Sequence, residues 1–253
     1  MLARRLLAEA VGTAGLLAIV VGSGIMGAKL AGGNGAIALL ANALATGFGL
    51  FVLISVFAPI SGAHFNPLVS IIGLLDGGLD RRTLFAYVVV QLIAAVAGTW
   101  LAHAMFGLPL LDVGTQARSG ASQWLSEIIA TAGLVLAIQG SKKKSVEAVA
   151  AIVGAYIAAA YWFTASTSFA NPAVTIARSL TSTFAGIAPG DAIGFIAAQL
   201  VGAASAYWLS RYLWPRAVEP LPSVTQTDSQ RVSSASSLAA NERGAIDTVR
   251  RSS

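Results

Sequence analysis

Cysteine is absent from this 253-residue chain, and charged residues are scarce. The lack of cysteine excludes disulfides, thiolate metal sites and a cysteine nucleophile. Charged residues make up 11% of the sequence, where a soluble domain has roughly 25%. Hydrophobic residues make up 56%, and the mean hydropathy is +0.74. This composition is typical of a polytopic membrane protein, in which a net charge of +5 reflects basic ends and loops rather than nucleic-acid binding.

Histidine is also rare, with two copies in the chain. Two histidines without cysteine assemble no set of metal ligands, so we expect no metal and no cofactor. The sequence contains no Ser-His-Asp arrangement in a plausible context and no paired carboxylates that would share one cleft. These absences argue against an enzyme.

Six apolar segments are long enough to cross a bilayer, which takes about 20 residues. They lie at residues 6–27, 36–57, 82–106, 123–141, 145–163 and 189–213. Two shorter apolar segments, 66–76 and 171–183, begin with Asn-Pro and would form helices of roughly 15–20 Å, half a bilayer. The sequence predicts an all-α membrane protein with six transmembrane helices and two re-entrant half-helices over residues 1–215. Residues 216–253, rich in Ser, Thr and charge, are expected to be a disordered cytoplasmic tail.

An internal repeat relates the two halves of the membrane segment, about 1–110 and 120–215. The stretch EAVGTAGL that begins at Glu9 matches EIIATAGL that begins at Glu127, and HFNPL at 64–68 matches FANPA at 169–173. Each repeat holds three spans, and three is odd, so the second copy starts on the opposite side of the membrane. Inverted repeats of this kind are typical of transport proteins with a central pathway.

The distribution of Lys and Arg predicts the orientation of the chain in the membrane. With a cytoplasmic N-terminus, thirteen of the sixteen basic residues lie inside. The three outside are Lys29, Arg118 and Arg178. This bias follows the positive-inside rule and places both termini in the cytoplasm.

Each Asn-Pro pair predicts the start of a short helix. Proline suits the first helical turn, and the preceding asparagine, Asn66 or Asn171, is a good N-cap. The loops before them must be enclosed by protein or line a cavity, because lipid cannot satisfy their backbone. Inverted symmetry brings the two helix N-termini together near the midplane, where their positive dipole ends repel cations and their amides donate to a neutral solute.

The stretches SGAHFNPLVS and FANPAV, together with Glu9 and Glu127, resemble the aquaporin and aquaglyceroporin family (major intrinsic proteins) over about residues 1–214. The resemblance implies a bacterial-type inner-membrane homotetramer with one pore per protomer. It implies passive conduction of small neutral solutes and proton exclusion at the paired asparagines. It also implies that Glu9, Glu127 and His64 anchor the re-entrant loops, which we favour over a proton relay.

The sequence departs from the family pattern around both motifs. The pore motifs read Asn66-Pro67-Leu68 and Asn171-Pro172-Ala173. Family members usually carry Arg after the second motif, where this chain has Val174, and the Asp that marks typical glycerol facilitators is replaced by Thr175. Leu68 replaces the usual Ala; we interpret this as a packing adjustment, and the alternative is a shifted or narrowed midpoint.

The remaining selectivity-filter positions, carried over by spacing, are Thr46, Ala159 and Ser168. Their rivals are Phe48 in the second span, Ala158 in the fifth and Thr167 in the loop. A constriction of Thr46, Ala159, Ser168 and Val174 would be wide, mildly polar and uncharged, so we expect uncharged solutes larger than water to pass. Bacterial members with Val after the second motif resemble channels linked to arsenic handling, which implies arsenite, methylated arsenicals, glycerol-like polyols and water as solutes.

Arg178 follows Val174 by four residues and shares its helix face. We expect Arg178 to remain in the outer vestibule, which leaves the filter wide. The alternative is a water-selective channel in which Arg178 reaches back as a displaced filter arginine. Two other classes stay open at this point: a coupled secondary transporter and a non-conducting scaffold of the same fold.

Overall fold

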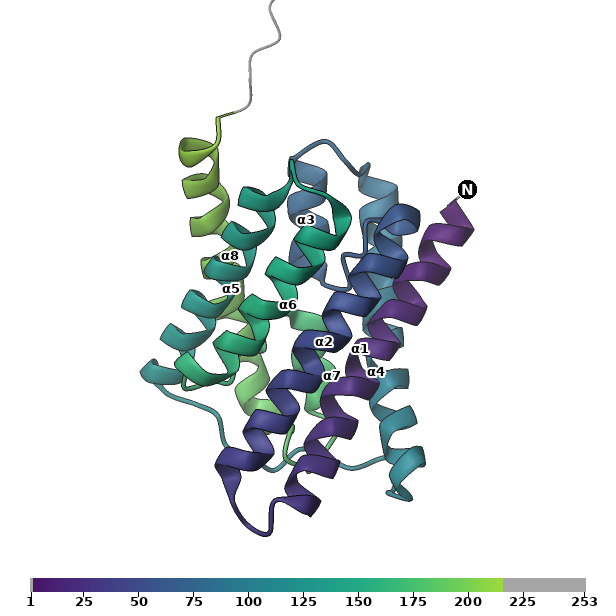
Figure 1. The fold of residues 1–253 in the computed structure, drawn as a ribbon, viewed down its shortest axis with the longest axis vertical. Helices are drawn as coiled ribbons and strands as arrows, with labels where there is room; N and C mark the ends of the chain where they lie inside the picture. The colour runs from purple at the N-terminus through teal and green to yellow at the C-terminus, as the bar shows by residue number, and fades with distance from the viewer. Residues whose placement is uncertain (1, 216–253) are drawn as a thin grey trace, which may run out of the picture. The chain divides into compact units, whose positions relative to one another are not determined.

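The computed structural model describes residues 2–215, which form eight α-helices and no strand (Figure 1). Six helices are long and apolar enough to span a membrane: α1 (Leu2–Leu30), α2 (Gly35–Ser61), α4 (Arg81–Phe106), α5 (Ala121–Ser141), α6 (Val146–Phe163) and α8 (Pro189–Leu213). Two are short: α3 (Pro67–Leu75) and α7 (Pro172–Arg178). The predicted all-α membrane fold with six spans and two half-helices is confirmed. The predicted tail, 216–253, lies outside the described residues.

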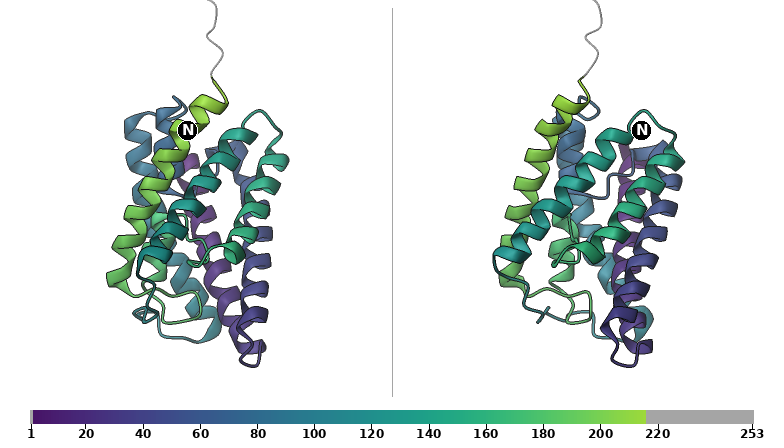
Figure 2. Two further views of the ribbon diagram at one scale, coloured as in Figure 1. Left: turned by 90° about the vertical axis from the view of Figure 1, so that its left-hand side faces the viewer. Right: turned by 60° about the vertical axis from the view of Figure 1, so that its left-hand side comes forward.

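The helices follow the predicted repeat. Each half of the chain runs through two long helices, one half-helix and a third long helix, α1 to α4 and then α5 to α8. Within each half, the first long helix packs against the second and the last, and α2 packs against α6 to join the halves. Figure 2 shows the bundle from two further sides; within it α3 packs against α4 and α8, α7 packs against α4 and α8, and the two short helices contact each other. The inverted repeat thus brings both half-helices to the centre of one bundle.

Glycines set how closely the long helices approach each other. A Cβ added to Gly98 of α4 would lie 2.2 Å from the Ala14 carbonyl oxygen of α1. In the second repeat, a Cβ on Gly202 would lie 2.3 Å from the Ile128 carbonyl oxygen. Small residues at such contacts let backbones touch, which is how helices gain packing energy in lipid.

The second half-helix is shorter than the sequence predicted. Helix α7 ends at Arg178, not near residue 183, because the chain turns back after Ser179. The Ile187 N–H donates to the Arg178 carbonyl (3.2 Å), and the Gly114 N–H donates to the Ser179 carbonyl (2.9 Å). Residues 179–188 therefore form a folded segment that covers the C-terminal end of α7.

Candidate functional site

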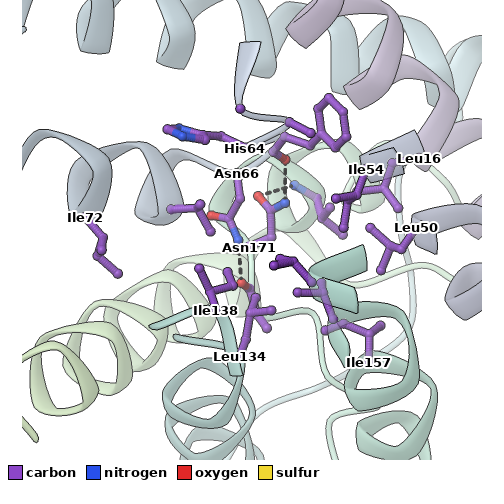
Figure 3. Close-up of a pocket in the computed structure, with 18 of the residues that line it drawn as sticks. Leu16, Leu50, Ile54, His64, Asn66, Ile72, Leu134, Ile138, Ile157 and Asn171 are labelled. Carbon is purple, nitrogen blue, oxygen red and sulfur yellow. Dashed lines mark hydrogen bonds between the residues drawn. The ribbon is translucent and has the colours of Figure 1, made fainter. Parts of the chain in front are cut away.

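Asn66 and Asn171 begin the two half-helices and meet at the centre of the bundle. The Asn66 side-chain oxygen accepts from the Leu68 N–H (2.9 Å), and that of Asn171 accepts from the Ala173 N–H (2.9 Å). Each amide also donates across the repeat, Asn66 to the Ala170 carbonyl and Asn171 to the Phe65 carbonyl, both at 2.8 Å. The two bonds across the repeat appear as dashed lines in Figure 3, where the two asparagines lie side by side.

The loops that lead into the asparagines hold non-glycine residues in the left-handed region. Ala63 and Phe65 have φ of 49° and 51°, and Ser168 and Ala170 have φ of 51° and 49°. The four positions are equivalent, three residues and one residue before each asparagine. Such conformations cost about 1–3 kcal/mol each and persist only where surrounding contacts enforce them. The loops therefore need strong anchors.

Two buried carboxylates supply these anchors. Glu9 of α1 accepts from the His64 and Phe65 backbone N–H groups at 2.9 and 2.8 Å. Glu127 of α5 accepts from the Phe169 and Ala170 N–H groups, both at 2.9 Å. Carboxylates that accept several N–H bonds satisfy backbone groups that lipid could not.

A glutamine and a hydroxyl complete each anchor. Gln199 of α8 donates to Glu127 (2.6 Å) and to the Thr175 hydroxyl (2.9 Å), which donates to the Asn171 carbonyl (2.9 Å). In the first repeat, Gln91 donates to Glu9 (2.9 Å) and to the Ser70 hydroxyl (3.0 Å). Thr175, noted in the sequence as a missing Asp, thus belongs to the loop support. Each glutamine thus donates to the anchor glutamate of its own repeat and to the hydroxyl four residues after that repeat's asparagine. In the sequence, only the matching positions of Gln91 and Gln199 indicate this pattern.

A cavity of about 350 Å³ runs past both asparagines. Most of its wall is aliphatic and comes from α1, α2, α5 and α6; Figure 3 labels Leu16, Leu50, Ile54, Leu134, Ile138 and Ile157. Lys142 and Asp76 form an ion pair at one end, and Gln139 donates to Asp76 (2.9 Å). Arg178 lines the cavity toward the other end. We call these the Lys142 end and the Arg178 end.

Three of the residues predicted for the filter, Thr46, Ser168 and Val174, line this cavity. Ala159 does not: it is exposed on the outer side of α6, and the structure corrects that prediction. The reason is helical geometry, because the lining residues of α6 recur every four positions and this series ends at Tyr161. Counting twelve residues back from Asn171 selected Ala159, two residues before the lining residue Tyr161.

The rival filter positions also lie outside the cavity wall. Phe48 is 70% exposed on α2, and Ala158 packs where α6 meets Gly47. Thr167 belongs to the re-entrant loop with φ of 60°.

Tyr161 is the functional candidate that spacing missed. Its hydroxyl lies 3.2 Å from the Thr46 Oγ1, so the two side chains form a hydrogen bond between α6 and α2. Both residues are buried and both line the cavity. The series Val149, Val153, Ile157 and Tyr161 is the signal that could have found it.

Arg178 does not occupy an open vestibule, which corrects the sequence prediction. Its side chain is 1% exposed, and its guanidinium carbon lies 3.4 Å from the centre of the Phe169 ring. Its Nε donates to the Ala185 carbonyl, and the residue lines the same cavity as Thr46 and Tyr161. The physical reason is the folded segment 179–188, which closes over the end of α7.

A second arginine lies on the same ring. The Arg118 guanidinium carbon is 5.3 Å from the Phe169 ring centre, and its Nε donates to the Gly186 carbonyl (2.9 Å). Arg118 lies in the loop between α4 and α5, outside the spanning helices. The pKa of Arg118 is lowered from its ordinary value, because the effect of burial exceeds the opposing effects of Glu127 and Tyr161. The Arg178 end of the cavity is therefore a region of positive charge.

The two remaining predicted residues have different surroundings. Leu68 is buried with Ile72 and Val135 in an apolar cluster; Ile72 lines the cavity, and Leu68 does not. His64 lines the cavity, and its Nδ1 lies 3.1 Å from the Ser70 hydroxyl.

This bundle, with two half-helices that meet at paired asparagines beside a cavity, defines a class of membrane channel. Residues 1–145 match the family model described as Major intrinsic protein. The chain is 55% identical over 212 residues to Aquaglyceroporin AqpS of Rhizobium meliloti, covering 84% of this chain and 91% of that protein. It is 32% identical over 203 residues to Probable aquaporin TIP2-2 of Oryza sativa subsp. japonica, covering 77% and 80%.

The fold is also that of a solved structure. The X-ray structure of the aquaglyceroporin from Plasmodium falciparum superposes with a TM-score of 0.70 at 20% identity, covering 85% of this chain and 98% of that one. The chain belongs to the major intrinsic protein family. It is a multi-pass membrane channel and not an enzyme.

Proposed function

We propose that this channel conducts small uncharged polyhydroxylated solutes, of the glycerol and arsenite class, together with water. One observation carries the proposal: Val174 faces the cavity at the position where the family usually has arginine. Arg178, the nearest substitute, is held against the wall by Phe169 and Ala185. The pathway therefore keeps room beside Val174 that an arginine there would fill.

The chemistry of the wall suits solutes with one apolar and one polar side. Val174 and Leu50 offer apolar contact, while Thr46 and Tyr161 offer hydroxyl groups. A hydrogen bond from either of these to a passing hydroxyl group would lower the cost of desolvating the solute. Neutral arsenite carries three hydroxyl groups, and methylated arsenicals add the apolar side.

The centre of the pathway supports selection against ions. The N-termini of α3 and α7 direct positive dipole ends at the same place, and the asparagine side chains are fixed by their helix caps and by bonds to a carbonyl of the opposite loop. Cations are repelled there, and protons cannot follow a water chain whose central members bind fixed donors.

Orientation and assembly belong to the same proposal. The Lys142 end carries Lys142 to Lys144, Arg81 and Arg82, and helix α1 begins there too (Figure 1). We place this end in the cytoplasm by the positive-inside rule. From the family resemblance, we propose a homotetramer in a bacterial-type inner membrane.

A second candidate is a water-selective channel in which Arg178 replaces the usual filter arginine. The observation that favours it is the burial of Arg178 in the same cavity wall as Thr46 and Tyr161. Its guanidinium would then narrow the pathway and donate hydrogen bonds to water. The two candidates differ in whether glycerol and arsenite pass.

Stopped-flow light scattering on proteoliposomes separates the candidates. The first predicts that wild-type protein carries water, glycerol and arsenite without an ion gradient, and that Val174→Arg lowers glycerol permeability by about tenfold or more, the scale on which pocket shape discriminates small solutes. Val174→Leu is the uncharged control and should retain most of the flux. Water flux with no solute flux in the wild type would favour the second candidate and refute the first.

A further inference from the structure

His103 is a completely buried histidine that the pathway does not touch. It lies in the last turn of α4, with Nδ1 2.7 Å from the Pro109 carbonyl oxygen and Nε2 2.8 Å from the Thr181 hydroxyl. A carbonyl only accepts, so Nδ1 donates to Pro109, and Nε2 forms a hydrogen bond with the Thr181 hydroxyl. Both ring nitrogens thus have fixed partners.

Thr181 links His103 to the folded segment that covers the end of α7. Its hydroxyl oxygen also accepts from the Thr183 backbone N–H at 3.3 Å and lies 2.8 Å from the Thr183 Oγ1. Gly186 closes the same turn, since a Cβ there would lie 2.2 Å from the Thr181 carbonyl oxygen. The segment is tied to α4 through one histidine.

The same segment holds the Arg178 side chain. Ala185 accepts from the Arg178 Nε, and the Ile187 N–H donates to the Arg178 carbonyl (3.2 Å). Among the described residues, Arg178 forms no ion pair with a carboxylate. It sits at the end of a seven-residue helix, so α7 alone does not fix where the guanidinium lies. Its place against Phe169 depends on the segment from Thr181 to Ile187.

We infer that His103 is a positioning residue for the channel's selectivity: it holds residues 181–187 against α4 and so keeps the Arg178 guanidinium against the wall. Bonds to Asp112 and Arg118 still hold the segment to the loop before α5. Loss of the His103–Thr181 bond therefore loosens the side of the segment that faces α4 and lets the guanidinium move toward the pathway beside Val174. This inference rests on the proposed function only in that Arg178 borders the solute pathway.

Thr181→Val tests the inference, because it removes one hydroxyl at nearly constant volume. We expect the ratio of glycerol to water permeability to fall by about three- to tenfold, the effect of one hydrogen bond on a conformational equilibrium. His103→Phe should give the same direction, and His103→Gln, which keeps an acceptor near Thr181, should restore part of the ratio. Thr83→Val, at the opposite end of α4, is the matched control and should leave the ratio unchanged.

A double-mutant cycle with Arg178→Met separates positioning from general stability. In that background, Thr181→Val should have no further effect on the permeability ratio, because no guanidinium remains to move. If Arg178→Met does not yield folded protein, Arg178→Gln serves as the background. An unchanged permeability ratio in folded Thr181→Val, whatever its melting temperature, would overturn the inference, as would an equal change in both backgrounds.

Failure of the proposed function gives a different result. If wild-type protein carries only water, the Arg178 positioning still predicts that Thr181→Val changes water permeability and that Arg178→Met removes this effect. The flux of the wild type tests the solute, and the cycle tests the positioning.

Discussion

Glu127→Gln tests the anchoring of the second re-entrant loop most sharply. The carboxylate accepts from the backbone N–H groups of Phe169 and Ala170 and from Gln199, at 2.6–2.9 Å. A glutamine of the same shape keeps one oxygen and turns an NH₂ group toward a donor. At least one charge-assisted bond is lost and one buried N–H is left unpaired, which costs about 2–5 kcal/mol in the free energy of unfolding.

The assay is reversible unfolding in mixed detergent micelles followed by circular dichroism, with glycerol and water flux measured on the same preparation. We expect the free energy of unfolding to fall by that amount and both fluxes to fall together, since Ala170 and Ser168 leave their strained conformations. Glu147→Gln, at an exposed carboxylate of α6, is the control and should change stability by about 1 kcal/mol or less. Equal stability of Glu127→Gln and wild type would refute the anchoring role.

Two further predictions concern packing and the pathway. Gly98→Ala should destabilise the fold by about 1–3 kcal/mol, because the new methyl group overlaps the Ala14 carbonyl, while Gly190→Ala, with open space around it, should have little effect; thermal melts compare them. Tyr161→Phe removes a wall hydroxyl that can bond a passing solute, together with its hydrogen bond to Thr46, and should lower glycerol permeability relative to water by about two- to fivefold in stopped-flow measurements, the effect of a weak hydrogen bond. An unchanged ratio would place the Thr46–Tyr161 pair outside the selective part of the pathway.

Local signals predicted the helices and the start of each half-helix. An apolar run of about 20 residues has few structural solutions in lipid, and Asn-Pro places an N-cap and a first-turn proline at a defined position. The matching stretches that begin at Glu9 and Glu127 indicated the inverted repeat. These features depend on neighbours in the sequence, so no tertiary information was needed to find them.

The residues that line the pathway could not all be predicted from sequence spacing, because their positions depend on tertiary contacts. The distance along the chain from α6 to Asn171 varies with loop length, so counting selected Ala159 instead of Tyr161. The position of Arg178 depends on residues 179–188, whose fold is set by α4 and by the loop before α5. The prediction of a vestibule position for Arg178 assumed that α7 continues outward. It was wrong because α7 ends at Arg178 and the chain folds back over that end.

The absence of cysteine makes a direct test of the pathway available. A single cysteine at Val174 should line the conducting route, while one at Leu68, which is buried and does not line the cavity, should not. We expect mercuric chloride to block most glycerol and water flux in Val174→Cys proteoliposomes, reversibly with excess thiol, and to leave Leu68→Cys and wild type unaffected. Flux through Val174→Cys that resists the reagent after confirmed labelling would contradict a solute pathway beside Val174.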